Sequence, residues 1–274
     1  MLRHFVVATI VSCLATAGWA QSPSPTPAAP AKSIAKKPAA KAKPAAKSDV
    51  AAQSGPCSLG VISAIGDRFA VQKFGITVFE NEENFIPIGD WGLDDLVIAR
   101  VHAATGNDPS VRKIAYPKGV FELYFNPKSR LLRDPGERLP AIVQSFTART
   151  NCDRYLVVTR VRAEEPGAHL QLDGIGAYNR GLGSLIRHSH LFANFEVNVL
   201  DGRTYENLNR AFAGVGARLS QGMRITEDPL NRLDNAQFPE PPSSAASSAT
   251  LRERTRELVA TRLDQTLPDY LKQQ

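Results

Sequence analysis

Residues 21–55 limit the part of this chain that can fold. Of these 35 residues, 23 are Ala, Pro or Lys, and the segment shows no apolar periodicity. Such a composition buries too little apolar surface to offset the entropy that is lost on ordering. We therefore expect a disordered, partly polyproline-like linker over residues 21–55, followed by a single domain over residues 56–274.

The first 20 residues are typical of a secretory signal peptide. Arg3 makes the N-terminus positive, an apolar stretch runs from Phe5 to Ala17, and small residues precede a cleavage position after Ala20. This stretch is shorter than the roughly 20 apolar residues of a membrane-spanning helix. We expect cleavage after Ala20 and a periplasmic or secreted protein. An uncleaved membrane anchor and lipidation at Cys13 are the alternatives.

Most of the net charge of +6 lies in the linker rather than in the domain. Residues 21–55 contain six Lys and one Asp, whereas residues 56–274 contain 26 basic and 26 acidic side chains. Domains that bind nucleic acid carry a basic face, so this distribution argues against a nucleic-acid partner. The linker is expected either to contact anionic membrane lipids or cell-wall polymers electrostatically, or to be a spacer only.

Cleavage after Ala20 leaves two cysteines, Cys57 and Cys152. In an oxidising compartment, two thiols in one domain usually pair. We expect a disulfide that joins the start of the domain to the strand after Cys152. Two free thiols are the alternative, and no neighbouring feature marks either cysteine as a catalytic nucleophile.

The pattern of residues 56–274 predicts an α/β (α+β) domain with a mixed, mostly antiparallel sheet and packed helices. Strands are expected at residues 59–65, 68–79, 111–116, 155–161 and 171–180, the last pairing antiparallel with 155–161. Helices are expected at residues 90–105, 136–150 and 250–268. Residues 155–161 are continuously apolar, which favours a central strand. The Pro/Ser-rich residues 238–249 are expected to form a linker-like loop before the C-terminal amphipathic helix.

Two helices carry clear end signals. Asp90 is predicted to cap the first, with Asp94 and Asp95 compensating the dipole of its first turn, and its inward face is Leu93, Leu96, Val97, Val101 and Ala104. The Thr250–Glu253 capping box is predicted to open the C-terminal helix. Its apolar stripe is Leu251, Leu258, Val259, Leu263 and Leu267. Its arginines, which are expected to lie in solvent, are Arg252, Arg254, Arg256 and Arg262.

Asp201-Gly202 separates two strand-like segments. Phe195, Val197 and Val199 alternate with polar residues before it, and a second strand is expected from Arg203. Asp-Gly is favoured in two-residue type I′ turns because both central residues take positive φ. The sequence therefore predicts a tight β-hairpin.

Two segments resemble a group of bacterial envelope proteins. They are the strand that opens with an acidic-aromatic pair, Asp153-Arg154-Tyr155-Leu156-Val157-Val158-Thr159, and the hairpin segment Val197-Asn198-Val199-Leu200-Asp201-Gly202-Arg203-Thr204. The group includes the curli-secretion channel lipoproteins, the activator lipoproteins of penicillin-binding proteins and the N-terminal domain of TolB. The resemblance implies a non-catalytic α/β module that serves assembly or regulation. The chain departs from most of the group because no lipid-bearing Cys stands at its expected mature N-terminus, and it is more similar still to a family of uncharacterised exported proteobacterial proteins.

His188 and His190 are the candidate metal ligands. Two imidazoles at this spacing suit zinc or copper, but a metal site needs a third ligand. His169 and Asp173 are the nearby candidates for it. Solvated histidines at a loop end are the alternative. The glycine-dense segment 174–183 does not fit a dinucleotide fingerprint, so its glycines are expected to mark close backbone packing.

No sequence motif for a nucleophile, a metal or a phosphate-binding loop marks this chain as an enzyme. Asp94 and Asp95 are adjacent and point apart, and Asp67 reads as a turn residue. The sequence predicts an exported cell-envelope protein that is a non-catalytic interaction or assembly module, with envelope proteins as partners and no cofactor. The alternative is a periplasmic hydrolase or metal-binding protein that uses His188 and His190.

Overall fold

A computed structural model describes residues 55–75, 80–126, 138–165, 170–182, 186–209 and 229–272. The predicted signal peptide and nearly all of the predicted linker lie outside these residues, which all belong to the compact unit 53–274. No helix among the described residues has the length and apolar character to cross a membrane. The described residues have the predicted mixed α+β fold and form three sheets and a C-terminal helix.

The described residues form strands, α-helices and short 3₁₀ turns. The strands are β1 (Leu59–Ala64), β2 (Arg68–Phe74), β3 (Glu82–Pro87), β4 (Val111–Lys113), β5 (Arg154–Arg160), β6 (Arg162–Glu165), β7 (Leu170–Asp173), β8 (Ile175–Leu182), β9 (Ile186–Ala193), β10 (Phe195–Asp201) and β11 (Arg232–Leu233). The α-helices are α1 (Leu93–Ala104), α2 (Glu122–Phe125), α3 (Leu139–Thr147) and α5 (Ala249–Leu271). Short 3₁₀ turns are η2 (Gly89–Trp91), η4 (Asn235–Gln237) and η5 (Pro242–Ser247).

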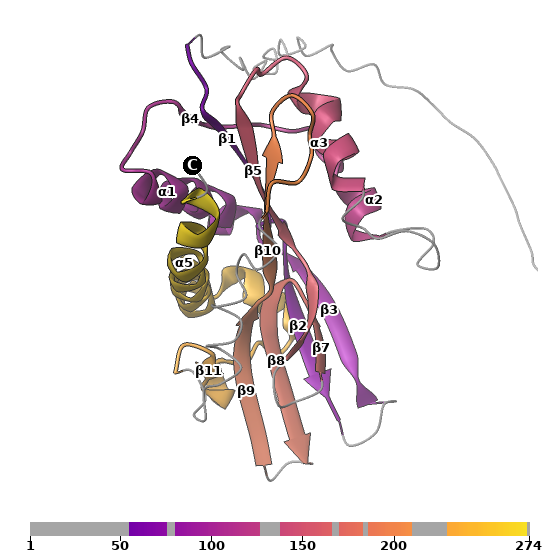
Figure 1. Ribbon diagram of the computed structural model, residues 1–274. Helices are drawn as coiled ribbons and strands as arrows, with labels where there is room; N and C mark the ends of the chain where they lie inside the picture. Colours follow the sequence, from indigo (N-terminus) through magenta and orange to yellow (C-terminus); the bar gives the residue numbers. More distant parts are fainter. Residues whose placement is uncertain are drawn as a thin grey trace, which may run out of the picture. The chain divides into compact units, whose positions relative to one another are not determined.

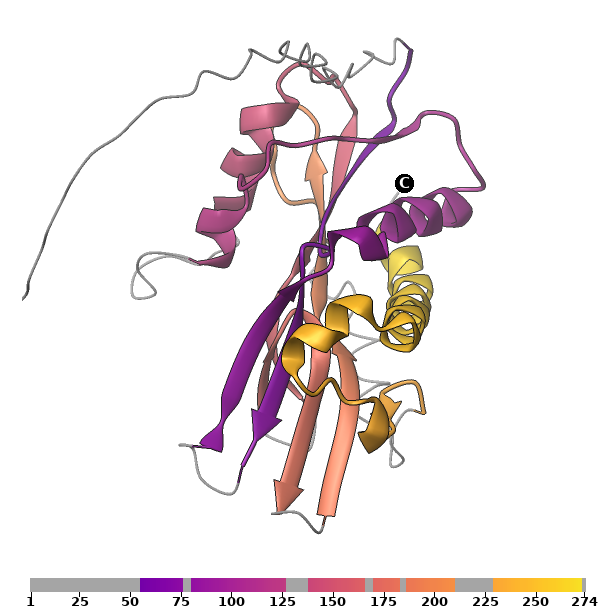
Figure 2. The ribbon, with the colours of Figure 1, turned by 180° about the vertical axis from the view of Figure 1, so that it is seen from behind.

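The first sheet has the order β10-β5-β1-β4 and two covered faces. β1 runs parallel to both β4 and β5, whereas β10 runs antiparallel to β5. α1 and α5 lie on one face, and α2 and α3 lie on the other (Figures 1 and 2). Tyr155 to Arg160 are all buried, which confirms the predicted central strand.

The second sheet has the order β11-β9-β8-β2-β3, and three of its four pairings are antiparallel, whereas β2 and β8 pair in parallel. Its edge strand β3 was not predicted, because Glu82, Glu83 and Pro87 are poor strand formers. An edge position tolerates them, since proline lacks only a donor that would face outward, and charge discourages pairing with other chains. The predicted strand 68–79 ends in β2 at Phe74, and residues 76–79 lie outside the described part of the chain.

The strands change sheet at a waist formed by Val161, Gly174 and Asn194. The Val161 N–H donates to the Asn194 carbonyl (3.0 Å), the Gly174 N–H to the Val161 carbonyl (2.9 Å) and the Asn194 N–H to the Gly174 carbonyl (2.7 Å). This closed ring of bonds lies between β5 and β6, between β7 and β8, and between β9 and β10. The waist therefore joins the sheets without a loop.

The predicted strand 171–180 is wrong in both extent and pairing. Gly174 has a φ of +69°, which breaks the segment into β7 and β8. β7 pairs with β6, and β8 pairs with β2 and β9. The neighbours of β5 are instead β1 and β10, because strands distant in the sequence fill those places.

α1 begins later than predicted. Asp90 lies in η2 rather than at a cap, and the N-cap residue is Gly92, whose φ is +65°. Leu93, Val97 and Val101 are buried as expected, whereas Ala104 is exposed near the end of the helix. Two further elements are shorter than predicted: β4 ends at Lys113, and α3 spans Leu139–Thr147.

α5 carries the predicted apolar stripe but not the predicted cap. Its five stripe residues are all buried against the sheets and α1: Leu251, Leu258, Val259, Leu263 and Leu267. The helix starts at Ala249, where the Ser248 Oγ accepts from the Leu251 N–H (3.3 Å), so the capping box at Thr250 is not formed. Pro268 lies inside the helix, which continues to Leu271.

Three α5 arginines expected in solvent instead bind backbone carbonyls: Arg254, which reaches those of Arg232 and Pro229, and two more. Arg256 donates to the carbonyls of Trp91 (2.6 Å) and Gly92 (2.9 Å), which end η2 and precede α1. Arg262 donates to the Ala193 carbonyl at the end of β9. A guanidinium offers several N–H donors on a long apolar stem, so it covers apolar surface and still reaches unpaired carbonyls. These arginines therefore fix the helix to the elements beneath it.

Residues 238–249 pack on the domain rather than forming an open linker. Phe238 and Ala245 are buried in the larger hydrophobic cluster, and η5 contacts β3. The Trp91 indole N–H donates to the Ala246 carbonyl (3.2 Å). The Pro/Ser-rich composition thus produces short 3₁₀ turns that cover the sheet.

The turn after β10 differs from the predicted type I′ hairpin. The next backbone bridge joins Leu200 to Asn207, so the turn holds the six residues 201–206, four more than expected. The Asp201 Oδ1 accepts from the N–H groups of Arg203 and Thr204, both at 2.8 Å. This side-chain bonding holds a wider turn, because Asp competes with regular pairing for nearby backbone donors.

Candidate functional site

The two predicted metal ligands lie on β9, in the second sheet. His188 and His190 are two residues apart and share one face of the strand, while Ser189 faces the other way. His190 stacks on Tyr178 of β8 with ring centroids 4.8 Å apart. His188 is exposed at the register position opposite Arg180. Both imidazoles therefore lie on the same side of one strand.

A cleft of about 710 Å³ opens at this edge of the sheet. It is bounded by β9, β11, the start of η4 and one residue of α5. The lining residues are His188, Ser189, His190, Pro229, Arg232, Leu233, Asp234, Asn235 and Arg254. Most of these residues are exposed, so the cleft faces solvent.

The wall of the cleft on the α5 side is held by a chain of hydrogen bonds. The Asn179 Nδ2 donates to the Ser189 Oγ (2.7 Å), and the Ser189 Oγ donates to the Asn235 Oδ1 (2.8 Å). The buried Ser189 hydroxyl is therefore fully engaged and has no base beside it among these partners. A serine nucleophile needs an adjacent general base, and strand alternation places both histidines on the opposite face.

Positive charge dominates the lining of the cleft. Arg232 is exposed opposite His190 in the β9–β11 pairing. Arg254 of α5 also lines the cleft, where it donates to the backbone carbonyls of Arg232 (2.6 Å) and Pro229 (3.4 Å). Asp234 is the only carboxylate among the described lining residues, and it accepts from the Ala236 N–H (2.9 Å).

The candidate third ligands do not join the histidines in the described structure. Asp173 lies next to the waist, where it pairs with Arg68 (3.0 Å) and Arg162 (3.6 Å). His169 lies outside the described residues. Within the described ranges, no three His, Cys, Asp or Glu side chains are grouped as metal ligands. The described geometry thus offers two imidazoles but not a complete metal site.

The glycine-dense segment lies mainly in β8 and is packed tightly. A Cβ on Gly176 would overlap the Ala70 carbonyl oxygen and would lie 2.6 Å from the Phe192 ring. The glycine is required because β2 and β9 approach its backbone closely. This finding supports the expected close backbone packing at Gly176.

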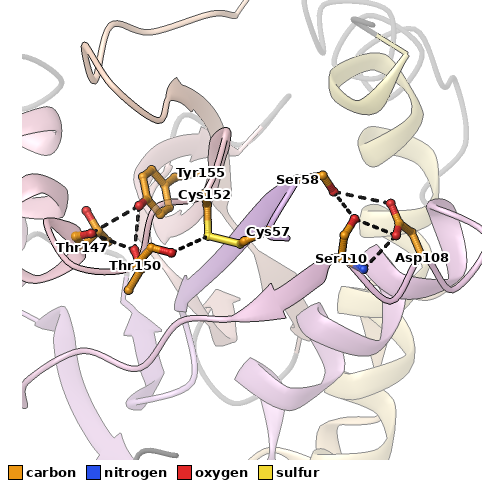
Figure 3. The surroundings of a disulfide bond; sticks show 8 residues. All are labelled: Cys57, Ser58, Asp108, Ser110, Thr147, Thr150, Cys152 and Tyr155. Carbon is orange, nitrogen blue, oxygen red and sulfur yellow. Dashed lines mark hydrogen bonds between the residues drawn. A yellow bond between two sulfur atoms is a disulfide. The ribbon is translucent and has the colours of Figure 1, made fainter. Parts of the chain in front are cut away.

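The predicted disulfide between Cys57 and Cys152 is present, and both residues are buried. It joins Cys57, two residues before β1, to the turn before β5, with the two Cα atoms 4.5 Å apart (Figure 3). The Asp153 N–H donates to the Cys57 carbonyl (2.9 Å), which continues the parallel pairing beyond the strands. The bond therefore fastens the two central strands of the first sheet at their starts.

A second polar group beside the disulfide ties β1 to β4 (Figure 3). The Ser58 Oγ lies 2.5 Å from the Ser110 Oγ, and the Ser110 N–H and hydroxyl both donate to Asp108. These hydrogen bonds from Ser110 lower the pKa of Asp108. Asp108 thus keeps its negative charge at the exposed turn, where it organises the backbone rather than a reaction.

A third polar cluster lies near the carboxyl ends of β1 and β5. Arg160 is 3% exposed, forms an ion pair with Asp67 and lies 3.5 Å from the centroid of the Phe125 ring. Burial lowers the pKa of Arg160, while Asp67 opposes that shift. Burial, with Asp94 and Asp67 nearby, also raises the pKa of Tyr116.

Sequence reasoning missed this cluster because its members come from distant segments with no common motif. Perturbed pKa values often mark functional sites, but ion-pair networks that serve the fold produce them as well. Here the Tyr116 hydroxyl donates to the Ser63 carbonyl (2.7 Å), and Asp67 pairs with a buried arginine. These bonds hold the start of β2 against the end of β5, so the cluster serves the fold.

Asp94 lies in the first turn of α1, as predicted, and it also ties that turn to the end of β1. Its Oδ1 accepts from the Ser63 hydroxyl (2.6 Å) and from the N–H groups of Ile65 (3.1 Å) and Gly66 (3.2 Å). Burial raises the pKa of Asp94 above 3.8, although these hydrogen bonds oppose the shift. A raised pKa in the folded state favours folding at low pH, and this contribution is lost as the pH rises through the folded-state value.

Replacing Asp94 with Asn should therefore change how stability depends on pH. The amide Oδ1 keeps all three donors but carries no charge to desolvate. Relative to Asp94→Asn, the wild type should lose melting temperature as the pH rises from about 3 to 7, because its buried carboxyl must ionise. Melting curves of both proteins over this range test the expectation, and a constant difference would contradict it.

Comparison of the chain with protein-family models, curated proteins and solved structures found no match.

Proposed function

We propose that this chain is an exported cell-envelope protein whose domain is a non-catalytic interaction or assembly module. The geometry of the cleft beside β9 carries the proposal. The cleft faces solvent, yet its buried Ser189 points away from His188 and His190. A polar cleft of this kind offers hydrogen bonds and charge to a partner without a nucleophile beside a base.

Export is supported by the disulfide and by the predicted signal peptide. Disulfides persist in oxidising compartments such as the periplasm and are rare in the cytosol. Both cysteines of the bond between Cys57 and Cys152 are buried, as is typical of a disulfide that stabilises a fold. We place the mature protein in the periplasm or outside the cell, with cleavage after Ala20.

The resemblance to envelope assembly proteins also supports the proposal. The two resembling segments form β5 and β10 with the turn that follows β10, and these strands pair with each other along their whole length. Arg154 lies opposite Asp201, and Tyr155 lies opposite Leu200. The two segments therefore form one structural unit of the first sheet, as a shared module would.

Co-purification tests the proposed function. The tagged mature protein is cross-linked in bacterial envelopes and compared with Arg232→Glu, which reverses a charge in the cleft. Arg252→Glu is the matched control, because Arg252 is exposed on α5 and does not line the cleft. We expect a protein partner to co-purify with the wild type and with the control. The amount of this partner should be lower with Arg232→Glu.

The same purified protein distinguishes the rival function. A periplasmic hydrolase or metal-binding protein that uses His188 and His190 should contain about one zinc or copper ion per chain, lost in His188→Ala. That result would overturn the proposal. Metal analysis of the wild type and the variant is the measurement.

The linker gives a further prediction, which concerns residues outside the described structure. Its lysines lie among Ala and Pro with no aromatic residue, so attraction to an anionic surface should be electrostatic only. Deleting residues 21–55 should leave the melting temperature unchanged and abolish low-salt binding to anionic vesicles or cell-wall material. If the truncated protein binds such surfaces as well as the mature chain, the linker is only a spacer.

A further inference from the structure

The pairing of three strands places four basic residues on one face of the second sheet. Arg232 of β11 lies opposite His190 of β9, and Arg180 of β8 lies opposite His188. Residues in register share a face, so these four side chains form two adjacent rows. We call them the basic rows.

The basic rows have little negative charge to oppose them. Arg180, His188 and Arg232 are exposed, and Arg254 lines the cleft from α5. Among the described lining residues the single carboxylate is that of Asp234, which already accepts from a backbone N–H. Residues 56–274 are neutral overall, so this local excess of positive charge is a property of the site rather than of the domain.

We propose that the cleft and the basic rows bind an extended acidic segment of a partner protein. The inference rests on the proposed function and names the chemistry of that partner. Residues i and i+2 of a strand are about 7 Å apart, which is the spacing of His188 and His190. An extended peptide with acidic residues at alternate positions repeats at the same distance, so its side chains follow the two rows in step.

Neither a small anion nor a bilayer fits the surface as well. Neighbouring strands lie about 5 Å apart, so the basic rows cover an area wider than one phosphate group can contact at once. A cleft of about 710 Å³ is concave, whereas a lipid surface is flat at this scale. Guanidinium groups pair readily with carboxylates in a bidentate geometry, which suits an acidic side chain.

Binding of a fluorescent hexaglutamate peptide to the full mature protein tests the proposal. At low salt we expect saturable binding, at least about tenfold weaker in Arg180→Glu/Arg232→Glu and weakened by added salt. The control Arg252→Glu reverses a charge outside the cleft. Its affinity for hexaglutamate should lie within about twofold of that of the wild type, a difference that reflects only the change in net charge. Hexalysine should not bind. Melting curves show whether the variants fold, and Arg232→Gln repeats the test without charge reversal.

Three results would overturn the proposal. The first is equal binding of hexaglutamate by Arg180→Glu/Arg232→Glu and by Arg252→Glu. The second is inorganic phosphate that binds as tightly as the peptide through the same arginines, which would make this a small-anion site. The third is binding to phosphatidylglycerol vesicles that depends on these arginines when the peptide does not bind.

The peptide measurement also separates this inference from the proposed function. Hexaglutamate binding at the basic rows without any co-purified protein would leave the inference standing and remove the support for a protein partner in the envelope. A co-purified partner that is insensitive to Arg180→Glu/Arg232→Glu, with no hexaglutamate binding, would support the interaction function and overturn the inference.

Discussion

Removing the disulfide should lower the free energy of unfolding by about 4–5 kcal/mol, because the unfolded chain regains the conformational entropy that closing a loop of this length removes. Cys57 and Cys152 are 95 residues apart in sequence and bracket β1 to α3, so the bond restricts nearly half of the domain. The Cys57→Ala/Cys152→Ala variant also leaves small cavities, since both sulfurs are buried. Urea denaturation of the oxidised protein and the variant gives the difference.

Reduction provides the control for this prediction. Dithiothreitol should destabilise the wild type toward the stability of the variant and should leave the variant itself unchanged. Alkylation of the oxidised mature protein under denaturing conditions should label no cysteine. Two labelled cysteines in a periplasmic preparation, or equal stabilities of wild type and variant, would contradict the prediction.

The second large effect is expected for Gly202→Ala. A Cβ at this position would overlap the carbonyl oxygen of Cys152 and lie 2.7 Å from the carbonyl carbon and oxygen of Asp153. All three are backbone atoms, so no side chain can rotate away. The end of β10 must then separate from the start of β5, and we expect a loss of about 3 kcal/mol, as for an overpacked core.

Gly89→Ala is the matched control for Gly202→Ala. Both glycines have backbone conformations open to other residues, but no atom lies within 4 Å of a Cβ built on Gly89. Gly89→Ala should therefore change stability by less than about 0.5 kcal/mol. Chemical denaturation of both variants measures the contrast, and equal losses would show that close approach to Cys152 is not the cause.

The parts of the fold that were predictable carry their signal within one segment. The apolar run of β5 indicates burial on both faces, and it is central in the sheet. The stripe of α5 repeats at helical spacing, and all five of its members are buried. The cysteine pair needed only the expectation of an oxidising compartment.

The parts that were missed depend on distant neighbours. Gly174 reads as one glycine among several, and only its place in the waist explains why β7 and β8 separate there. β3 is polar because an edge strand has one open side. Ser248 caps α5 two residues before the capping box, since either start satisfies local rules and packing of η5 selects one.

The candidate site was predictable only in part for the same reason. His188 and His190 stand out in the sequence and lie on one strand face. Arg232 and Arg254 join them from more than 40 residues away, through a strand of two residues and one turn of a helix. A two-residue strand has no periodicity to detect, so the charge of the cleft becomes visible only in the fold.

The position of the disulfide also determines how the domain would bear mechanical load. A pull on the linker enters the fold at residue 55 and reaches Cys57 two residues later. The covalent bond passes that force directly to Cys152 and the start of β5, so β1 is not peeled away from its neighbours. From β5 the force reaches β10 along seven paired residues and then β9 through the waist. A partner bound at the cleft would therefore be connected to the linker by strands that are pulled along their length. Paired strands resist a pull in this direction because many hydrogen bonds must break at once.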